Sequence, residues 1–424
     1  MPRRRPRSSP QRPAVRDPRG SAFADEATTL LQQLGFPCVV GNGGGGLGVF
    51  ASRHISAGTK ILEERPLVLT VAHSARMHTC CMCLCDSRTV GLDAWERRCE
   101  SCDMQYYCNE HCALAASVRH CGVECTALSG VDWAAIDEDD RDAVVQAIRI
   151  LADRANGVLH DIGPAGTLGA DAYQHRLVGI TPSTATARDS LDRICAATLR
   201  AVPPAARVAP TELLDILERH SCNLYGVSGQ AGAEVASASF VGFFHLFNHS
   251  CCPSVVFDSA RPVEAAHISS VNGTPRGEVG EVGKEVGDDG VSNSRSEKGT
   301  LTNSASNNLQ TSRPPTFALL ALEDVPEGTE LCISYTSSAE GPAQRREHLE
   351  EYYGFWCECA RCTCDDVAAE LDFCDRMDAR RCCLDSCGSG LGVPLGEDDG
   401  SDGQGESLLR CVHCGGLFEA DTEG

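Results

Sequence analysis

The segment FNHSCCP, residues 247–253, holds a short string on which the interpretation of this chain depends. Asn248 and His249 are adjacent, and Cys251 follows two residues after the histidine. On its own, such a string is equally typical of a turn in which an asparagine side chain caps the backbone. Its meaning therefore depends on which other motifs accompany it.

Three further motifs accompany it. A glycine-rich stretch, residues 43–48, enters the strand-like sequence VFA, and the downstream sequence ELCISY ends at Tyr335. The third motif, YYGFWCECARC, spans residues 352–362 and holds three closely spaced cysteines. Together with the string at 248–253, these motifs occur in the order found in SET-domain lysine methyltransferases that carry a MYND insertion. The chain resembles that family from about residue 36 to residue 364.

The resemblance implies an α+β fold. In it, a SET-domain β-fold is split by a MYND zinc finger and a helical insert, and a cysteine-rich post-SET zinc region follows. The activity implied is that of an S-adenosylmethionine-dependent protein-lysine N-methyltransferase, a chromatin regulator acting on lysines of histones or other basic proteins. The alternative is a catalytically inactive SET/MYND module for zinc-dependent protein interaction. Ser254, where the family often has Asn, favours the alternative, whereas Tyr335, Asn248 and His249 together favour the enzyme.

The resemblance also assigns site residues. Tyr335 matches the catalytic tyrosine at the lysine channel, and the glycine turn matches the loop whose backbone approaches the cofactor closely. Cofactor contacts are implied for Gly46, Leu47, Gly48, Asn223, Asn248, His249, Tyr335 and Phe355. A post-SET zinc is implied at Cys251, Cys357, Cys359 and Cys362.

The implied reaction is in-line transfer of the sulfonium methyl group to a lysine Nε. The amine has to arrive neutral, although the pKa of a free lysine is about 10.4. A narrow apolar channel and the adjacent sulfonium charge would lower that pKa, so no dedicated base is required. The sequence shows no paired carboxylates suited to that role, and we expect Tyr335 to act by orienting the amine.

Residues 80–125 contain ten cysteines and little apolar sequence, so bound metal must supply the stability that a core cannot. Eight ligands suit two tetrahedral zinc ions, and four protein ligands per ion leave no open position for catalysis. From Cys108 onward the spacing resembles the MYND finger, in which ligand pairs interleave around two ions. By that resemblance Cys80, Cys83, Cys108 and Cys112 hold one zinc, and Cys99, Cys102, His120 and Cys125 hold the other. Cys121 competes with His120, and Cys81 or Cys85 could replace a member of the first pair.

A last group, Cys383, Cys387, Cys411 and Cys414, predicts a further zinc site near the C-terminal end of the sequence. Cys382 is the alternative to Cys383. No apolar run near Met1 resembles a secretory signal, so we expect reduced thiols that bind metal rather than disulfides.

The balance of acidic and basic residues limits the classes of molecule that this chain can bind. The 424 residues carry 59 Asp and Glu against 37 Lys and Arg, a formal net charge of −22. Such a charge repels phosphate backbones and favours cationic partners, so we expect lysine-bearing protein substrates and no nucleic acid. The resemblance adds proline-rich peptides as ligands of the MYND finger. We expect a monomer. We expect no direct membrane contact, because no stretch of about 18 apolar residues occurs.

The N-terminal residues bear on location. Residues 1–20 carry seven arginines and five prolines, a composition typical of a disordered tail. We expect the nucleus, the cytoplasm or both, and the arginines leave an organelle transit peptide open.

The chain divides into segments that differ in composition and in hydrophobic pattern. The predicted units are a disordered basic tail (1–22), a SET N-terminal part (36–79), the MYND finger (80–125), a helical insert (126–221), a SET core part (222–260), a disordered insertion (261–315), a SET C-terminal part (316–340), the post-SET zinc region (341–364) and a cysteine-rich tail (365–424) that is a possible zinc ribbon.

Overall fold

The fold is mixed α+β, as the sequence predicts, in a computed structural model of the chain. The structure describes residues 14–17, 19–43, 46–157, 177–182, 184–229, 234–259, 315–337, 340–363, 373–374, 376–377, 380–384, 387, 391–395 and 408–419. Within these ranges, none of the helices has the length and apolar character needed to cross a membrane.

The helices are α1 (Ser21–Gln33), α2 (Glu110–His120), α3 (Val123–Ser129), α4 (Arg141–Asn156), α6 (Ala185–Ala201), α7 (Pro210–Ser221), α9 (Pro342–Tyr353) and α10 (Ala360–Thr363). The strands are β1 (Ala14–Arg16), β2 (Cys38–Gly43), β3 (Gly46–Ala51), β4 (Lys60–Glu64), β5 (Val68–Val71), β6 (Arg97–Arg98), β7 (Tyr106–Tyr107), β8 (Gly179–Thr181), β9 (Leu224–Ser228), β10 (Glu234–Ser239), β11 (Asn248–His249), β12 (Val255–Asp258), β13 (Phe317–Ala321), β14 (Glu330–Ile333), β15 (Gly392–Pro394), β16 (Leu408–Cys411) and β17 (Leu417–Glu419).

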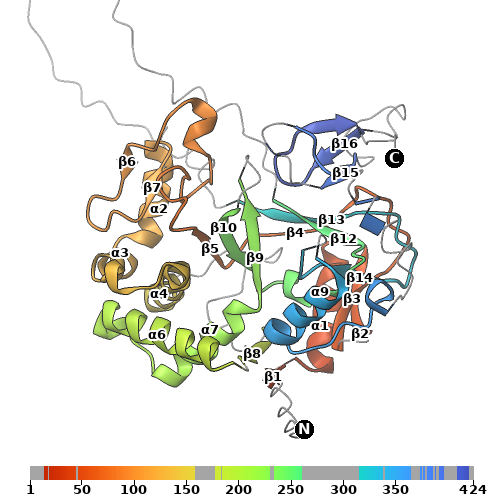
Figure 1. Ribbon diagram of the computed structural model, residues 1–424, viewed down its shortest axis with the longest axis horizontal. Coiled ribbons are helices and arrows are strands. Elements are labelled where there is room, and N and C mark those ends of the chain that lie inside the picture. The colour runs from red at the N-terminus through yellow and green to blue at the C-terminus, as the bar shows by residue number, and fades with distance from the viewer. Residues whose placement is uncertain are drawn as a thin grey trace, which may run out of the picture.

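Three small sheets form the centre of the molecule (Figure 1). Their strand orders are β11-β14-β3-β2, β12-β13-β4 and β5-β10-β9. Each sheet joins strands from the first 75 residues to strands that lie beyond residue 220. The centre is therefore built from distant parts of the sequence, and the segment between them forms separate structure at one side.

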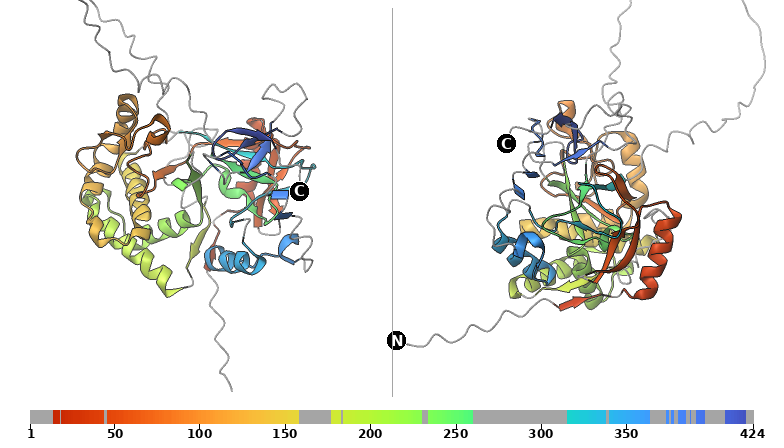
Figure 2. Two further views of the ribbon diagram at one scale, coloured as in Figure 1. Left: turned by 45° about the horizontal axis from the view of Figure 1, so that its top comes forward. Right: turned by 90° about the vertical axis from the view of Figure 1, so that its right-hand side faces the viewer.

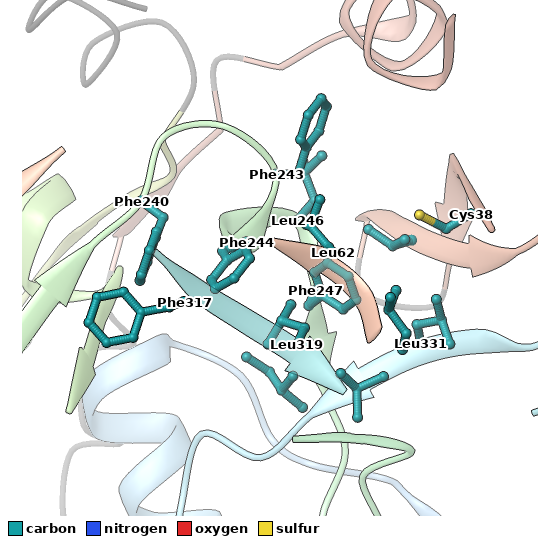
Figure 3. Close-up of a cluster of buried hydrophobic side chains, with 14 of the residues drawn as sticks. Cys38, Leu62, Phe240, Phe243, Phe244, Leu246, Phe247, Phe317, Leu319 and Leu331 are labelled. Carbon is teal, nitrogen blue, oxygen red and sulfur yellow. The ribbon is translucent and has the colours of Figure 1, made fainter. Parts of the chain in front are cut away.

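Aromatic side chains fill the core between these sheets, as Figure 3 shows for several of them. The ring centroids of Phe240 and Phe244 are 4.4 Å apart, and Phe257 stacks on Phe317 at 5.3 Å. Burying each ring removes a large apolar area from water. This core holds the strands that carry the candidate site.

A buried carboxylate organises the same core. Glu64 is 1% exposed, and its two oxygens accept hydrogen bonds from the backbone N–H groups of Gly242 at 2.6 Å, Phe243 at 2.8 Å and Phe244 at 3.2 Å. The sequence FVGFFHLF of residues 240–247 is typical of β structure, but these residues form a loop with a short 3-10 turn at Phe244–Leu246. A strand cannot present three successive N–H groups to one carboxylate.

Helices α3, α4, α6 and α7 pack together beside the sheets. The cysteine-rich residues 80–125 lie above these helices in Figure 1 and next to them in Figure 2. Val144, Ile148 and Leu151 are spaced i, i+4 and i+7, which predicts one apolar face of a helix, and all three are buried in the common core of these helices. The sequence predicts helices in residues 126–221, and most described elements of this range are helical. Strand β8 also lies in this range, and residues 158–176 lie outside the described part.

The start of the chain differs from the prediction of a disordered tail over residues 1–22. Strand β1 pairs antiparallel with β8, in the register Val15 with Ile180, and α1 begins at Ser21. Between them, the Arg19 side chain is 6% exposed, forms an ion pair with Asp17 and donates to the carbonyl oxygen of His245 at 3.4 Å. Pairing with a distant strand supplies order that the local composition does not. Residues 1–13 lie outside the described part, as does nearly all of the predicted insertion at 261–315.

Candidate functional site

A cavity of about 350 Å³ lies where β9, the 3-10 turn, the end of β14 and α9 meet. Six of its lining residues are Phe or Tyr, among them Tyr225, Phe244, Phe247, Tyr335 and Tyr353. Polar side chains, including Asn223, Ser334, Thr336 and His348, also line it, so aromatic faces and hydrogen-bonding groups share the wall. Two of the residues assigned from the sequence, Asn223 and Tyr335, line this cavity.

Tyr335 follows β14 and is held by its surroundings. Its hydroxyl donates to the carbonyl oxygen of Phe247 at 2.6 Å, and its ring lies 4.7 Å from that of Tyr353. Burial raises the pKa of Tyr335 well above its ordinary value, so the phenol is neutral. The hydroxyl oxygen and the Phe247 carbonyl are consequently two hydrogen-bond acceptors at one wall of the cavity.

Asn248 and His249 form β11, which pairs parallel with Cys332 and Ile333 of β14. This pairing sets His249 beside Tyr335, and Nδ1 of the imidazole accepts a hydrogen bond from the Tyr335 backbone N–H at 3.0 Å. Burial lowers the pKa of His249 to about 4, so the ring is neutral.

The other ring nitrogen of His249 then carries the proton. Nε2 lies 3.1 Å from Sγ of Cys251 and donates to it. The ring of Phe355 lies 5.9 Å from the same imidazole. His249 therefore links the strand that leads to Tyr335 with a cysteine cluster and with Phe355.

The glycine turn joins β2 and β3, and residues 44–45 at its tip lie outside the described part. Nδ2 of Asn248 donates to the carbonyl oxygen of Leu47 at 3.3 Å and to Oε1 of Glu330 at 2.8 Å. A Cβ atom at Gly48 would lie 2.4 Å from Oε1 of Glu330 and 2.7 Å from Nδ2 of Asn248. Glycine is therefore required where the hairpin meets these two polar side chains.

The side chain of Asn223, unlike those of the other assigned residues, bonds to backbone carbonyl oxygens of α7 and of the residues before β8. Its Nδ2 donates to the carbonyl oxygens of Arg219 at 2.7 Å and Val178 at 3.0 Å. These bonds tie the end of α7 to the residues before β8. The side chain is thus committed to the wall of the cavity, and its carbonyl oxygen is the group available to a ligand.

Four groups of ligand atoms could each hold a metal ion, with the atoms of each group within 4.8 Å of one another. The first cluster is Cys80, Cys83, Cys108 and Cys112; the second is Cys99, Cys102, His120 and Cys125; the third is Cys251, Cys357, Cys359 and Cys362; the fourth is Cys382, Cys387, Cys411 and Cys414. Sulfur and imidazole ligands in fours suit tetrahedral zinc.

The first two clusters interleave along residues 80–125, in the arrangement that the resemblance implies. His120 belongs to the second cluster, whereas Cys121 is exposed, because α2 ends at His120 and the chain turns away at Cys121. Neither Cys81 nor Cys85 contributes a ligand atom to either cluster.

His120 is oriented by neighbours beyond the cluster. Its Nδ1 lies 3.3 Å from Oε2 of Glu124, whose other oxygen accepts from Arg149 at 2.7 Å. Arg149 also donates to the carbonyl oxygen of Leu69 in β5. A carboxylate behind a histidine ligand is typical of zinc sites. Through these bonds, the second cluster is connected to α4 and to the central sheets.

The third cluster joins Cys251, just after β11, to three cysteines around the start of α10. Sγ of Cys251 lies 3.4 Å from that of Cys362 and 3.9 Å from that of Cys357. The Arg345 side chain is fully buried and donates to Sγ of Cys362 at 3.6 Å. A guanidinium beside four sulfurs balances the negative charge that a zinc tetrathiolate carries.

The fourth cluster corrects one assignment. Cys383 was expected as a ligand, but its side chain is exposed and Cys382 takes its place. Arg381 forms a β-bridge with Leu391, and in an extended chain successive side chains point to opposite sides. Cys382 therefore points inward toward Cys414, and Cys383 points to solvent.

Glu330, Glu64 and Arg345 are site residues that the sequence analysis missed. Each acts through a partner that is distant in sequence, such as Asn248 for Glu330. The available signal was weak: Glu64 and Glu330 lie inside the β-prone stretches KILEERPLV and TELCISY, and nothing in the local sequence marks Arg345.

No protein-family model matches the chain. The chain is similar to the histone-lysine N-methyltransferase ASHR2 of Arabidopsis thaliana, with 22% identity over 331 residues, covering 76% of this chain and 70% of that protein. At this level, the comparison supports a distant relationship to a histone-lysine methyltransferase.

Proposed function

We propose that this chain is a protein-lysine N-methyltransferase with a SET-type fold that uses S-adenosylmethionine and acts on lysines of histones or other basic proteins. The observation that carries the proposal is the parallel pairing of β11 with β14, which sets Asn248 and His249 beside Tyr335 at an aromatic cavity. The distant similarity to a histone-lysine methyltransferase supports the same class of reaction.

The residues present fit this cofactor. Glu330 and Asn248 fill the space against Gly48, whereas the hairpin is open at Gly46, where a Cβ atom would meet no atom within 4 Å, and Phe355 offers an aromatic face near His249. Asn248, His249, Phe355 and the backbone at residues 46–48 would hold the cofactor. When bound, S-adenosylmethionine supplies an electrophilic methyl group on a sulfonium centre.

The protein's own contribution is to bind and orient a lysine amine. An ammonium group that enters an aromatic cavity loses hydration, which lowers its pKa and favours the neutral nucleophile. The Tyr335 hydroxyl oxygen and the Phe247 carbonyl oxygen can then accept its N–H bonds, which directs the nitrogen lone pair. Fixing the amine in one orientation removes part of the entropic barrier to transfer.

Within the described residues, no carboxylate lines this cavity. The lining does include the imidazoles of His245 and His348, and we assign the transfer to orientation and desolvation of the amine. The first three cysteine clusters would hold structural zinc, because each supplies four protein ligands and leaves no open position.

Methyl transfer from labelled S-adenosylmethionine to core histones and to a whole-cell lysate tests the proposal. We expect label on lysine with the wild-type protein, and a loss of at least about 100-fold in Tyr335→Phe. Tyr352→Phe is the matched control, because Tyr352 is 58% exposed on α9 and no lining residue of the cavity.

Equal activity in Tyr335→Phe and wild type would refute the role of Tyr335. No transfer by folded, zinc-loaded wild-type protein would refute the enzyme and favour the inactive interaction module, for which binding of proline-rich peptides is then the assay.

A further inference from the structure

We propose that the fourth cluster, Cys382, Cys387, Cys411 and Cys414, is a structural zinc site whose ion fastens the β15-β16-β17 sheet onto strands β12 and β13. The proposal does not depend on the enzymatic activity. It concerns a part of the chain that follows the candidate site in sequence and lies above strands β12 and β13 in the view of Figure 1.

The sulfur geometry fits a tetrahedral ion. Sγ of Cys382 lies 3.8 Å from that of Cys414, and Sγ of Cys387 lies 3.8 Å from that of Cys411. With Zn–S bonds of about 2.3 Å, the edge of a regular tetrahedron is about 3.8 Å long. A disulfide would require about 2.05 Å, and all four cysteines are free.

Backbone donors surround the sulfurs as they do around metal-bound thiolates. The N–H groups of His413 and Cys414 point to Sγ of Cys411 at 3.3 and 3.4 Å, and the N–H of Gly416 points to Sγ of Cys414 at 3.4 Å. The turn that presents them is closed by Gly415, at a φ of +73° that side chains rarely adopt. Such N–H bonds favour the charged thiolate over the thiol.

The local core is too small to fold this part alone. Apart from the four cysteines, it contains only Leu384, Leu409 and Phe418 among the described residues. Four thiolates select a soft ion, and with no position left open the ion is structural. The free energy of zinc binding would replace the apolar burial that the module lacks.

The β15-β16-β17 sheet packs against the central strands β12 and β13. Val393 and Val412 pack against Leu320 and Leu322 at the end of β13. Asp258, the last residue of β12, forms an ion pair with Arg410 of β16.

A backbone bond adjoins this ion pair. The N–H of Ser259 donates to the carbonyl oxygen of Val412 at 2.9 Å. Strand β12 begins soon after Asn248 and His249, so the zinc site supports the far side of the strands that carry the candidate site.

The experiment counts zinc per full-length chain by elemental analysis and by native mass spectrometry. We expect Cys382→Ser to hold one zinc fewer than wild type, and Cys383→Ser, its exposed neighbour, to hold the same number as wild type. Equal zinc in wild type and Cys382→Ser, loss of a zinc from Cys383→Ser, or iron in place of zinc would each overturn the proposal.

Hydrogen exchange tests the fastening itself. We expect the amides of β16 and of Val255–Asp258 in β12 to exchange at least about tenfold faster in Cys382→Ser than in Cys383→Ser. Unchanged exchange in β12 would overturn the mechanical role. If Cys382→Ser does not fold, Cys414→Ser serves for both measurements, and the wild-type count must still show an ion beyond those of the first three clusters.

Discussion

At the scale of single residues, Glu330 is the least obvious member of the site. Its carboxylate accepts from Asn248 and lies against the hairpin at Gly48, so it fixes the asparagine that we assign to the cofactor. We expect Glu330→Ala to weaken S-adenosylmethionine binding about tenfold, because a hydrogen bond to a charged group contributes about 1.5 to 3 kcal/mol. Isothermal titration calorimetry measures this dissociation constant.

Glu327→Ala is the control for that measurement, because Glu327 is exposed in the turn just before β14. Both variants remove one negative charge from nearly the same place. If both weaken binding equally, the effect is one of net charge, and the positioning role of Glu330 is wrong.

Local motifs made some residues predictable and others not. Asn248, His249 and Tyr335 were assigned from short strings, and the structure brings them together. Whether Cys382 or Cys383 points inward depends on a bridge between Arg381 and Leu391 that no spacing reveals. The same holds for Glu330, whose partner Asn248 is 82 residues away.

At the scale of elements, the loop of residues 240–247 connects the core to the cavity. Its shape depends on the hydrogen bonds that the Glu64 carboxylate accepts, and it ends at Phe247, whose carbonyl holds Tyr335. Glu64→Gln replaces one oxygen by an NH₂ group that faces N–H donors. We expect the free energy of unfolding to fall by about 2 kcal/mol. Urea denaturation measures that change.

We also expect Glu64→Gln to reduce kcat for methyl transfer more than it raises KM, because the position of the acceptor at Phe247 shifts. Glu63→Gln is the matched control, since Glu63 is partly exposed and pairs with Lys60 at the surface, where an ion pair contributes little. A stability loss as large in Glu63→Gln as in Glu64→Gln would contradict the assigned role of the loop.

Elements were predictable where the pattern was local. The periodic stripe of Val144, Ile148 and Leu151 predicts the helix that is found as α4, and the short β-prone runs between turn glycines in residues 47–71 are typical of the strands β3, β4 and β5 found there. The composition of residues 1–20 predicted disorder, but β1 gains its backbone partners from β8, about 165 residues later in the chain. Apolar residues 240–247 resemble a strand, and only the buried Glu64 explains why they form a loop.

At the scale of the whole molecule, clusters of cysteines connect parts that the chain places far apart. Cys251 meets Cys362 across 111 residues, and Cys382 meets Cys414 across 32. The second cluster reaches the sheets through His120 and Glu124. If metal fills these clusters, the site is supported from several sides by ions, which compensates for small sheets of two to four strands.

The net charge of −22 leads to a prediction about substrate capture. Attraction between an acidic enzyme and a basic protein accelerates their encounter, and salt screens this attraction over about 10 Å at 0.1 M ionic strength. We therefore expect kcat/KM for a histone substrate to fall at least about tenfold between 50 and 300 mM salt. Steady-state methylation assays across this range measure the change.

A short lysine peptide of zero net charge is the control, and we expect its kcat/KM to change less than about twofold, because its capture depends on the cavity alone. Parallel salt dependence for both substrates would mean that the long-range field has no part in selection, and that contacts close to Tyr335 determine which lysine is bound.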